Sequence, residues 1–416
     1  MTHTPVAGSA AGPAAASSAG AGRILFVDLA RAVAVLLMVQ GHTIDALLHP
    51  DFRTSLQYNG WLYLRGLTSC TFLFLSGAAF SLTALRHWGD QGRFSRRSFK
   101  RVRRLAFFLG LGYFVKFPMG RFVDLPFATD ERWRSFFAVD VLQNVAITLL
   151  ALQVLIGLTR TPRRFAITCG VLAALVVGFT PLAHGVVWTD HLPLIAASYL
   201  SHDTGSLFPL FPWAGFTLLG AAFGVTAAPW ATRDHLQPLA RALFLTGAVL
   251  AIGAGLLGEL GWVEYGVHDW WRASPLSFAQ RFGSVLLLLS VVAAIGHYVT
   301  RLTPPLQGLA EESLLVYAAH VALLYGSHWT VGLGPRLGPQ PPGIVLVWVV
   351  AMLVAMTTLA LVWNNIQRLH PRLAVACRLT TWGALVFPLL LDRLVDFGHG
   401  QVRRASGRRP RGSGRG

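Results

Sequence analysis

About ten hydrophobic runs follow one another along this 416-residue chain, and they restrict its fold more than any other feature. A helix of about 20 apolar residues crosses the roughly 30 Å hydrocarbon core of a bilayer. A backbone in lipid must satisfy its own hydrogen bonds, so helices are the expected form. We therefore predict an all-α polytopic membrane protein with spans at residues 24–48, 61–85, 102–118, 136–158, 164–184, 207–228, 239–260, 278–300, 308–330 and 342–366.

A further apolar run, residues 379–395, is shorter, contains Pro388 and is closed by charged residues. A full eleventh span would separate the two termini, whereas an interfacial or re-entrant segment leaves both on one side. We predict the second arrangement, with about ten transmembrane helices rather than eleven. The chain then divides into a disordered tail (1–22), a transmembrane domain (23–370), the interfacial segment (371–397) and a basic disordered tail (398–416).

Charged residues are too few for a water-soluble surface, because they make up 13% of the chain against about 25% in soluble domains. The net charge of +17 is concentrated at residues 86–104 and 403–415. Basic residues beside membrane spans set topology, so we predict that these segments and both termini are cytoplasmic. This distribution also argues against a nucleic-acid partner. The composition, with thirty-three Arg against two Lys, looks bacterial, and we expect the bacterial plasma membrane.

The first predicted span carries four ionisable residues, although such residues are costly inside a bilayer. Asp28, Arg31, His42 and Asp45 fall within an arc of roughly 100° on a helix that turns by about 100° per residue. Arg31 and His42 lie nearly in line, about 16 Å apart along the axis. In the simplest reading, the first two residues form an ion pair and the histidine packs between helices. The shared face favours a functional stripe instead.

Elementary chemistry gives this stripe a use. A neutral imidazole is the usual general base near pH 7, and a neighbouring carboxylate such as Asp45 can orient it. An arginine can hold a phosphate through two parallel hydrogen bonds. We therefore expect Arg31, held by Asp28, to bind a phosphorylated carrier at one end of the helix. His42 would transfer protons at the other end.

Arg31, ten intervening residues and His42 resemble the Arg-x10-His signature of membrane-bound acyltransferases. Other segments are similar, in the expected order, to the heparan-alpha-glucosaminide N-acetyltransferase catalytic-domain family of the transmembrane acyltransferase superfamily. The similarity covers roughly residues 23–330. Its segments are MVQGHTID (38–45), FLFLSGAAF (72–80), VDVLQNVAITLL (139–150), FPLFPWAGFTLLGAAFG (208–224) and ESLLVYAAH (312–320).

The chain departs from the family pattern at two places. Ala32 stands where the family commonly has glycine after the arginine. Animal members have an asparagine where His42 stands and a histidine farther into the following loop, where the nearest candidate here is His49. The resemblance therefore leaves the catalytic base open between these two histidines.

Five further residues are candidates for the site. Tyr317 and His320 share a face of the span that contains them, where they form either an interhelical hydrogen-bond cluster or part of the site. Asp140 and Gln143 open another span and are candidates for lining an acceptor site. Trp213 follows a Phe-Pro pair and is either an interfacial anchor or part of a kinked helix entrance.

The basic segment between the second and third spans has two readings. It is most simply a topology determinant, but Arg101 and Arg104 could also attract an anionic cytoplasmic donor. The loop from His184 to Asp203 contains several His and Asp side chains whose spacing fits no zinc pattern. A solvated loop is the expected reading, and no metal is predicted.

These observations predict a membrane-bound acyltransferase, for which the family resemblance implies acetyl-CoA as the donor. We expect transfer from the cytoplasmic side to a glycan or lipid-linked acceptor at or beyond the outer face. The alternative is a proton-coupled transporter or flippase, since embedded Asp, Arg and His also build proton relays. Membrane lipid is an expected partner, and a homo-oligomer is possible.

Overall fold

The fold is described from a computed structural model that covers residues 25–373, apart from positions 87, 92–94, 120–121, 231, 262–264, 267–268, 328–329 and 371. The predicted N-terminal and basic tails, and nearly all of the predicted interfacial segment, lie outside these described residues. Within them, and apart from the connecting loops, the chain is helical except for two short antiparallel strands, β1 (Gly326–Ser327) and β2 (Thr330–Val331). The all-α prediction is confirmed.

Seven helices in the described part of the chain are long and apolar enough to cross a membrane. They are α1 (Leu25–Leu47), α2 (Leu56–Leu85), α6 (Val141–Thr159), α7 (Pro162–Ala183), α10 (Leu236–Glu259), α11 (Pro275–Tyr298) and α15 (Pro342–Leu369).

Three more helices occupy predicted spans but are more polar or shorter. Helix α4 (Arg96–Val115) begins in the basic segment, whereas α9 (Leu210–Thr226) and α13 (Ser313–Tyr325) are apolar and short. The count of ten spans depends on these three helices and stays a prediction. The remaining helices are α3 (Trp88–Gln91), α5 (Asp130–Phe137), α8 (Leu194–Ala197), α12 (Pro304–Glu311) and α14 (Leu333–Leu337).

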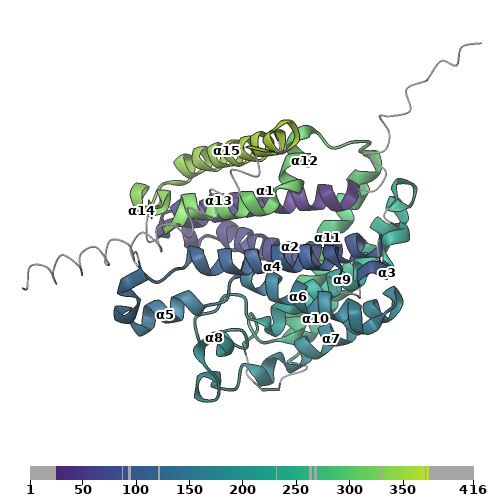
Figure 1. Cartoon of the computed structure of the whole chain (residues 1–416), viewed down its shortest axis with the longest axis horizontal. Coiled ribbons are helices and arrows are strands. Elements are labelled where there is room, and N and C mark those ends of the chain that lie inside the picture. Colours follow the sequence, from purple (N-terminus) through teal and green to yellow (C-terminus); the bar gives the residue numbers. More distant parts are fainter. Residues whose placement is uncertain are drawn as a thin grey trace, which may run out of the picture.

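The long helices lie side by side, with α1 packed against α2, α13 and α15 (Figure 1). We name the two ends of the bundle after residues of α1, the Arg31 end and the His42 end. Helix α2 runs antiparallel to α1, because Asp45 near the end of α1 pairs with Arg65 near the start of α2. Helix α13 runs parallel to α1, because Arg31 contacts its first residue and Tyr325, its last, donates to the His42 carbonyl.

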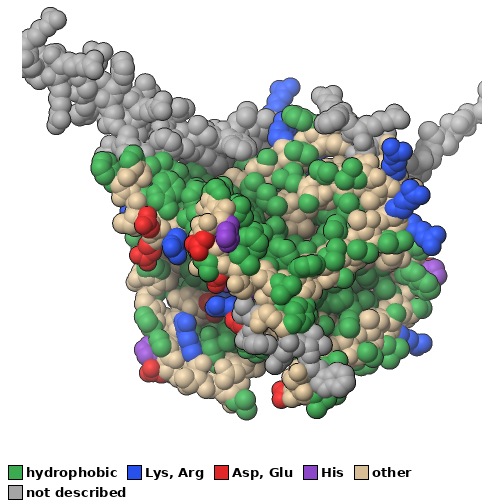
Figure 2. All heavy atoms as spheres, turned by 90° about the horizontal axis from the view of Figure 1, so that it is seen from below, with side chains coloured by type: hydrophobic (Ala, Val, Ile, Leu, Met, Phe, Trp, Pro, Cys, Tyr) green, Lys and Arg blue, Asp and Glu red, His purple; other side chains and the backbone are tan. Residues whose placement is uncertain are grey.

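Basic side chains gather at the Arg31 end. Arg101 of α4 stacks on Phe80 near the end of α2, and Arg368 near the end of α15 pairs with Glu311. Figure 2 shows hydrophobic side chains across the middle of one face, a row of Lys and Arg at its right edge, and basic and acidic side chains mixed at its left edge. Basic residues without nearby acidic ones at one end are what a positive-inside arrangement requires.

The predicted span at 308–330 is wrong as a single helix. The chain breaks at Glu312, which leaves the helical region between α12 and α13, and it ends in the β1–β2 turn. Two adjacent acidic residues cause the break, since both direct their carboxylates to polar side chains of α15 rather than continuing an apolar face. The break makes Ser313 the first residue of α13.

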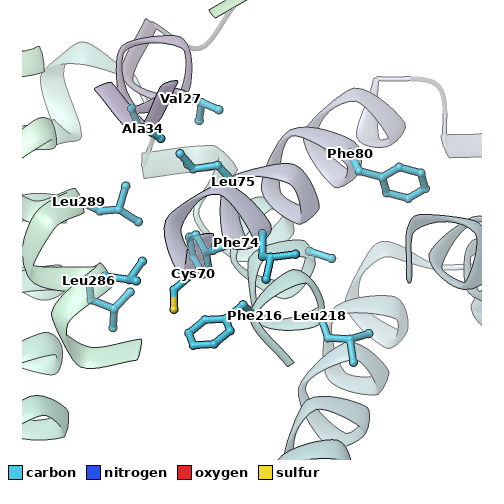
Figure 3. Packing of buried hydrophobic residues seen from close by; sticks show 14 of the residues in the cluster. Val27, Ala34, Cys70, Phe74, Leu75, Phe80, Phe216, Leu218, Leu286 and Leu289 are labelled. Carbon is cyan, nitrogen blue, oxygen red and sulfur yellow. The ribbon is translucent and has the colours of Figure 1, made fainter. Parts of the chain in front are cut away.

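The core is centred on α2 and α9, where large buried side chains such as Phe74 and Phe216 surround Cys70 (Figure 3). The two helices approach so closely that a Cβ atom on Gly77 would overlap the carbonyl oxygen of Thr217. A Cβ atom on Gly220 would overlap that of Phe74. Small residues at such contacts let membrane helices pack backbone to backbone. The segments 72–80 and 208–224, which resemble the family, therefore serve to pack α2 against α9.

This packing predicts that Gly220→Ala destabilises the protein by about 1–3 kcal/mol, because the added methyl group forces α2 and α9 apart. Thermal unfolding of detergent-purified protein measures the effect. Gly170→Ala on α7 is the matched control, since a Cβ atom there meets nothing within 4 Å. Equal melting temperatures for the two variants would contradict the close packing of α2 on α9.

Candidate active site on the seam between α1 and α13

The stripe predicted on α1 faces the stripe predicted on α13. Arg31 contacts Ser313, Met38 lies in one apolar cluster with Tyr317, and His42 contacts His320, so the two parallel helices meet at three successive levels. The two ends of the stripe are about 16 Å apart on α1 and about 10 Å apart on α13. The long side chain of Arg31 spans the remaining distance to Ser313. We call this contact line the α1–α13 seam.

At the Arg31 end of the seam, an Nη atom of Arg31 donates a hydrogen bond of 2.8 Å to Oγ of Ser313. The break at Glu312 places this serine on the first turn of α13, beside the arginine. A guanidinium has five N–H donors, so it can hold a serine and still bind oxygens of another group. The arrangement suits an anion contact near one end of the bundle.

At the His42 end, Nδ1 of His42 lies 2.8 Å from Nε2 of His320, and the two rings stack with centroids 5.1 Å apart. Nδ1 of the fully buried His320 lies 2.7 Å from the carbonyl oxygen of Val316. A carbonyl only accepts, so this Nδ1 must carry the proton. In a neutral His320, Nε2 then accepts from Nδ1 of His42. The lone pair of His42 is therefore on Nε2.

Between the two ends, the seam is filled by packed side chains. Met38, Leu142 and Tyr317 form a buried cluster, and Tyr317 also stacks on Phe72 of α2 with ring centroids 6.4 Å apart. Tyr317 contacts His320 edge to face at 5.7 Å. The predicted pair Tyr317 and His320 therefore lies beside His42 and belongs to the same cluster.

Asp45 does not orient His42, contrary to the sequence prediction. Its carboxylate forms an ion pair with Arg65 of α2, and its backbone carbonyl accepts a hydrogen bond of 2.9 Å from Arg53. The helical turn between residues 42 and 45 directs the two side chains to different neighbours. The orienting partner of His42 is His320, which only a long-range contact between α1 and α13 provides.

His49 lies outside the seam. It caps the turn Pro50–Thr54, where Nδ1 accepts from the amide of Asp51 at 3.4 Å and lies 3.3 Å from the Asp51 carboxylate. Its side chain is 43% exposed, whereas His320 beside His42 is fully buried. The geometry therefore places His42, and not His49, among the other candidate side chains of the seam.

Asp140 and Gln143 form a capping box at the start of α6, with the Gln143 side chain accepting from the Asp140 amide at 3.2 Å. The Asp140 carboxylate also pairs with Lys116 at 2.6 Å and acts electrostatically on Tyr325 of the seam. Gln143 is fully buried, and its Nε2 has no partner among the described residues. These groups border the seam at the His42 end.

The other predicted residues lie elsewhere. Arg101 donates to Gln153 of α6 at 3.1 Å and stacks on Phe80 of α2, and Arg104 stacks on Phe108. Trp213 lies in the first turns of α9 and packs against Phe208 and Phe216. These contacts lie outside the seam.

Two of the loop histidines are structural, and the expectation of a solvated loop fails for these two. His202 directs Nδ1 to the carbonyl of Ser206 at 2.7 Å, and His184 directs Nε2 to the carbonyl of Phe211 at 3.0 Å. Burial is the main cause that lowers the pKa of His202 to about 4, and it also lowers the pKa of His184. Both rings are therefore neutral at pH 7 and hold the loop against the start of α9.

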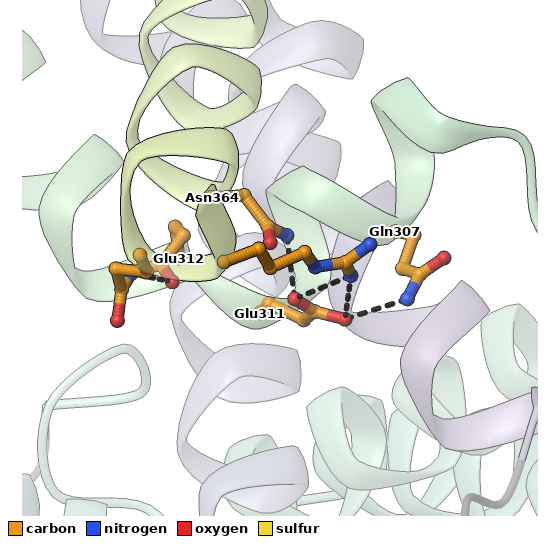
Figure 4. Close-up of polar contacts among 6 residues, drawn as sticks. Gln307, Glu311, Glu312 and Asn364 are labelled. Carbon is orange, nitrogen blue, oxygen red and sulfur yellow. Dashed lines mark hydrogen bonds and ion pairs between the residues drawn. The ribbon is translucent and has the colours of Figure 1, made fainter. Parts of the chain in front are cut away.

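Sequence reasoning missed the polar cluster that fixes the break before α13 (Figure 4). Glu311 accepts from Asn364 at 2.5 Å and from Gln307 at 2.7 Å, and Arg368 lies 3.5 Å away. Glu312 accepts from Gln367 at 2.6 Å. The sequence feature that could have revealed this cluster is the pair of adjacent acidic residues, Glu311 and Glu312, inside the predicted span 308–330. The cluster ties the start of α13, and with it Ser313, to the end of α15.

The fold and the seam define a class, that of polytopic α-helical membrane proteins with an embedded histidine pair and a half-buried arginine. A comparison with protein families matches residues 23–258 to the family described as heparan-alpha-glucosaminide N-acetyltransferase, catalytic. The chain belongs to this family of membrane acetyltransferases. The comparison with curated proteins finds no match. The matched region contains α1 and His42 but ends before α13, so His320, the partner of His42, lies outside the matched region.

The polar cluster predicts a coupling between Glu311 and Asn364. Because a hydrogen bond to a charged group contributes about 1.5–3 kcal/mol, each alanine substitution should destabilise the protein, and the double substitution should cost less than the sum. Thermal unfolding of the wild type, Glu311→Ala, Asn364→Ala and the double variant measures this. Strictly additive effects would show that the two side chains do not stabilise each other.

Proposed function

We propose that this chain is a transferase that moves an acetyl group from acetyl-CoA to an amine or hydroxyl group of a glycan or lipid-linked acceptor. The observation that carries the proposal is the hydrogen-bond chain from His42 through His320 to the Val316 carbonyl. These hydrogen bonds leave Nε2 of His42 as a basic nitrogen. The chain that carries it belongs to a family of membrane acetyltransferases.

In the proposed reaction, Nε2 of His42 takes the proton of the acceptor as its nitrogen or oxygen attacks the thioester carbonyl. The carbon–sulfur bond then breaks, and the leaving thiolate takes the proton back from His42. The proton on Nδ1 of His42 stays directed at Nε2 of His320 throughout. This hydrogen bond stabilises the imidazolium that forms on His42. A buried second group that orients a catalytic histidine plays the same part in other acyl transfers.

We place the donor at the Arg31 end, and we take this end as the cytoplasmic side of a bacterial plasma membrane. The support is the basic segments gathered at that end and the Arg31–Ser313 contact. Phosphate groups of coenzyme A suit the fork geometry of arginine. The termini would then both be cytoplasmic, with ten spans between them.

The donor arm has to pass the packed middle of the seam. Met38, Leu142 and Tyr317 occupy the line between Arg31 and His42. Methionine is unbranched and adaptable, so its side chain can change conformation at low cost. We therefore expect the arm of acetyl-CoA to displace Met38 when the acetyl group reaches Nε2 of His42.

The acceptor would enter from the His42 end. Asp140 is 25% exposed, and the buried Nε2 of Gln143 has a hydrogen-bond donor to offer. The Tyr325 hydroxyl lies at the same end and within electrostatic range of Arg65. Such hydrogen-bonding groups suit a hydroxyl-rich or amine-bearing acceptor.

His42→Ala is expected to lower kcat by a factor of about 10² to 10⁴, because it removes a general base. His320→Ala should also lower kcat, since the base loses the partner that fixes its proton. The double variant should be no slower than His42→Ala, because the two residues act as one unit. Transfer from labelled acetyl-CoA by protein in detergent measures all three rates, with thermal unfolding as the check on folding.

His49→Ala is the matched control for these variants and should keep wild-type activity. If His49→Ala abolishes transfer while His42→Ala does not, the base lies in the loop and the proposed mechanism is wrong. Multiplicative losses in the double variant would mean that His42 and His320 act separately.

Arg31→Lys is expected to raise the KM for acetyl-CoA about tenfold or more and to leave kcat nearly unchanged. Lysine keeps the charge but loses the paired donors, and a contact held equally in ground and transition states changes KM alone. Initial-rate kinetics against donor concentration measure both constants. Arg301→Lys, on an exposed residue, is the control. An unchanged KM would make Arg31 a packing and topology residue instead.

A further inference from the structure

Arg281 lies in the second turn of α11 and is held by two tryptophans. Its guanidinium carbon is 5.6 Å from the ring centroid of Trp213 on α9 and 5.3 Å from that of Trp271, in the segment before α11. The side chain is half-buried. Among the described residues, no carboxylate or hydrogen-bond acceptor partners it. The positive charge is therefore accompanied by aromatic faces alone.

Two further polar groups beside Arg281 also lack a partner in the described residues. Nε1 of Trp213, on one of the two rings, is buried and unbonded. Ser277 lies one helical turn before Arg281 on the same face of α11, and its hydroxyl is buried and unbonded, with the residue 1% exposed. Three donor side chains from two helices thus lack an acceptor in the part of the chain that the structure describes.

An unpaired guanidinium in a membrane-spanning helix is costly, and such residues pair with an opposite charge or mark a binding site. Buried polar groups are hydrogen-bonded in most proteins, so each exception requires an explanation. One anion with several oxygens would satisfy the arginine, the indole N–H and the serine hydroxyl together. A tetrahedral phosphate offers such oxygens, and arginine binds it through parallel hydrogen bonds.

The position of Arg281 favours a phosphate from the bilayer itself. Ser284, three residues along α11, bonds to Tyr63 of α2 at 2.8 Å, and Tyr63 lies two residues from Arg65 at the His42 end. Tryptophans are enriched at this interfacial level of membrane proteins. Trp271 is 55% exposed, and the neighbouring end of α10 exposes Leu256 and Leu260. The arginine therefore lies beside an apolar surface at one end of the bundle.

This position is separate from the seam. Residues 63 and 70 of α2 face α11 and the core, whereas residues 65 and 72, about 200° around the helix, face α1 and α13. Helix α2 thus forms a wall between Arg281 and His42. The group bound at Arg281 would not react there.

We propose that Arg281, Trp213 and Ser277 bind the phosphate of an anionic phospholipid from the leaflet at the His42 end. Arg281 supplies the charge, Trp213 and Ser277 supply two further donors, and Trp271 covers the guanidinium. The acyl chains lie along the exposed end of α10. The site needs no acetyl transfer, so it stands independently of the proposed function.

Delipidated protein in detergent tests the proposal by titration with phosphatidylglycerol, followed by thermal unfolding and native mass spectrometry. A ligand that binds only the folded state raises the melting temperature, and at a given concentration a tighter ligand raises it more. We expect the wild type to retain phosphatidylglycerol and Arg281→Gln to bind it about tenfold or more weakly, since hydrogen bonds to a charged group are lost. Arg301→Gln removes an equal charge elsewhere and should bind as the wild type does.

Two further arms identify the source of the phosphate. Diacylglycerol with the same chains lacks phosphate and should not stabilise the protein. Soluble glycerol phosphate lacks the chains and should bind far more weakly than the lipid. If diacylglycerol stabilises equally, or if glycerol phosphate binds as well as the lipid, the phospholipid site is refuted.

Trp213→Phe keeps a six-membered aromatic ring for Arg281 and removes the five-membered ring with its N–H, so it tests the site even if Arg281→Gln does not fold. It should weaken phosphatidylglycerol binding several-fold and leave the lipid-free melting temperature close to that of the wild type. Wild-type lipid affinity in both Trp213→Phe and Arg281→Gln would overturn the proposal.

Discussion

The hydrogen bond between His42 and His320 is the interaction on which the rest of the account depends. It joins the end of α1 to the middle of α13, two helices far apart in the sequence, and it fixes which nitrogen of His42 is basic. The same seam brings Arg31 to Ser313, which requires the break at Glu312. The polar contacts of Glu311 with α15 therefore support the site from a distance.

Helix α2 divides the bundle into two regions with different chemistry. One face of α2 carries Arg65 and Phe72, which contact groups at the seam. The other carries Tyr63 and Cys70, toward α11 and the core around Phe216. Close packing through Gly77 and Gly220 keeps α9 against α2. This rigid contact keeps the seam apart from the surface where Arg281 lies.

Local patterns predicted much of this structure. The apolar runs predicted the helices, because length and hydropathy are local properties, and the spacing of Arg31 and His42 predicted one helical face. The stripe on α13 was predicted as well, but the contact between the stripes was not, because no local pattern encodes which helices meet. For the same reason Asp45 was given to His42 instead of Arg65. The break at Glu312 was missed because its cause, the polar groups of α15, lies more than 50 residues away in sequence.

The most direct test of the central claim is an experimental structure of the protein with a non-hydrolysable acetyl-CoA analogue. We expect the phosphates to lie against Arg31 and the acetyl carbonyl carbon to lie within reach of Nε2 of His42. We also expect Met38 to have moved and the His42–His320 hydrogen bond to be intact. An analogue whose acetyl group lies away from His42, or a ligand bound with its phosphates at the His42 end, would contradict the account.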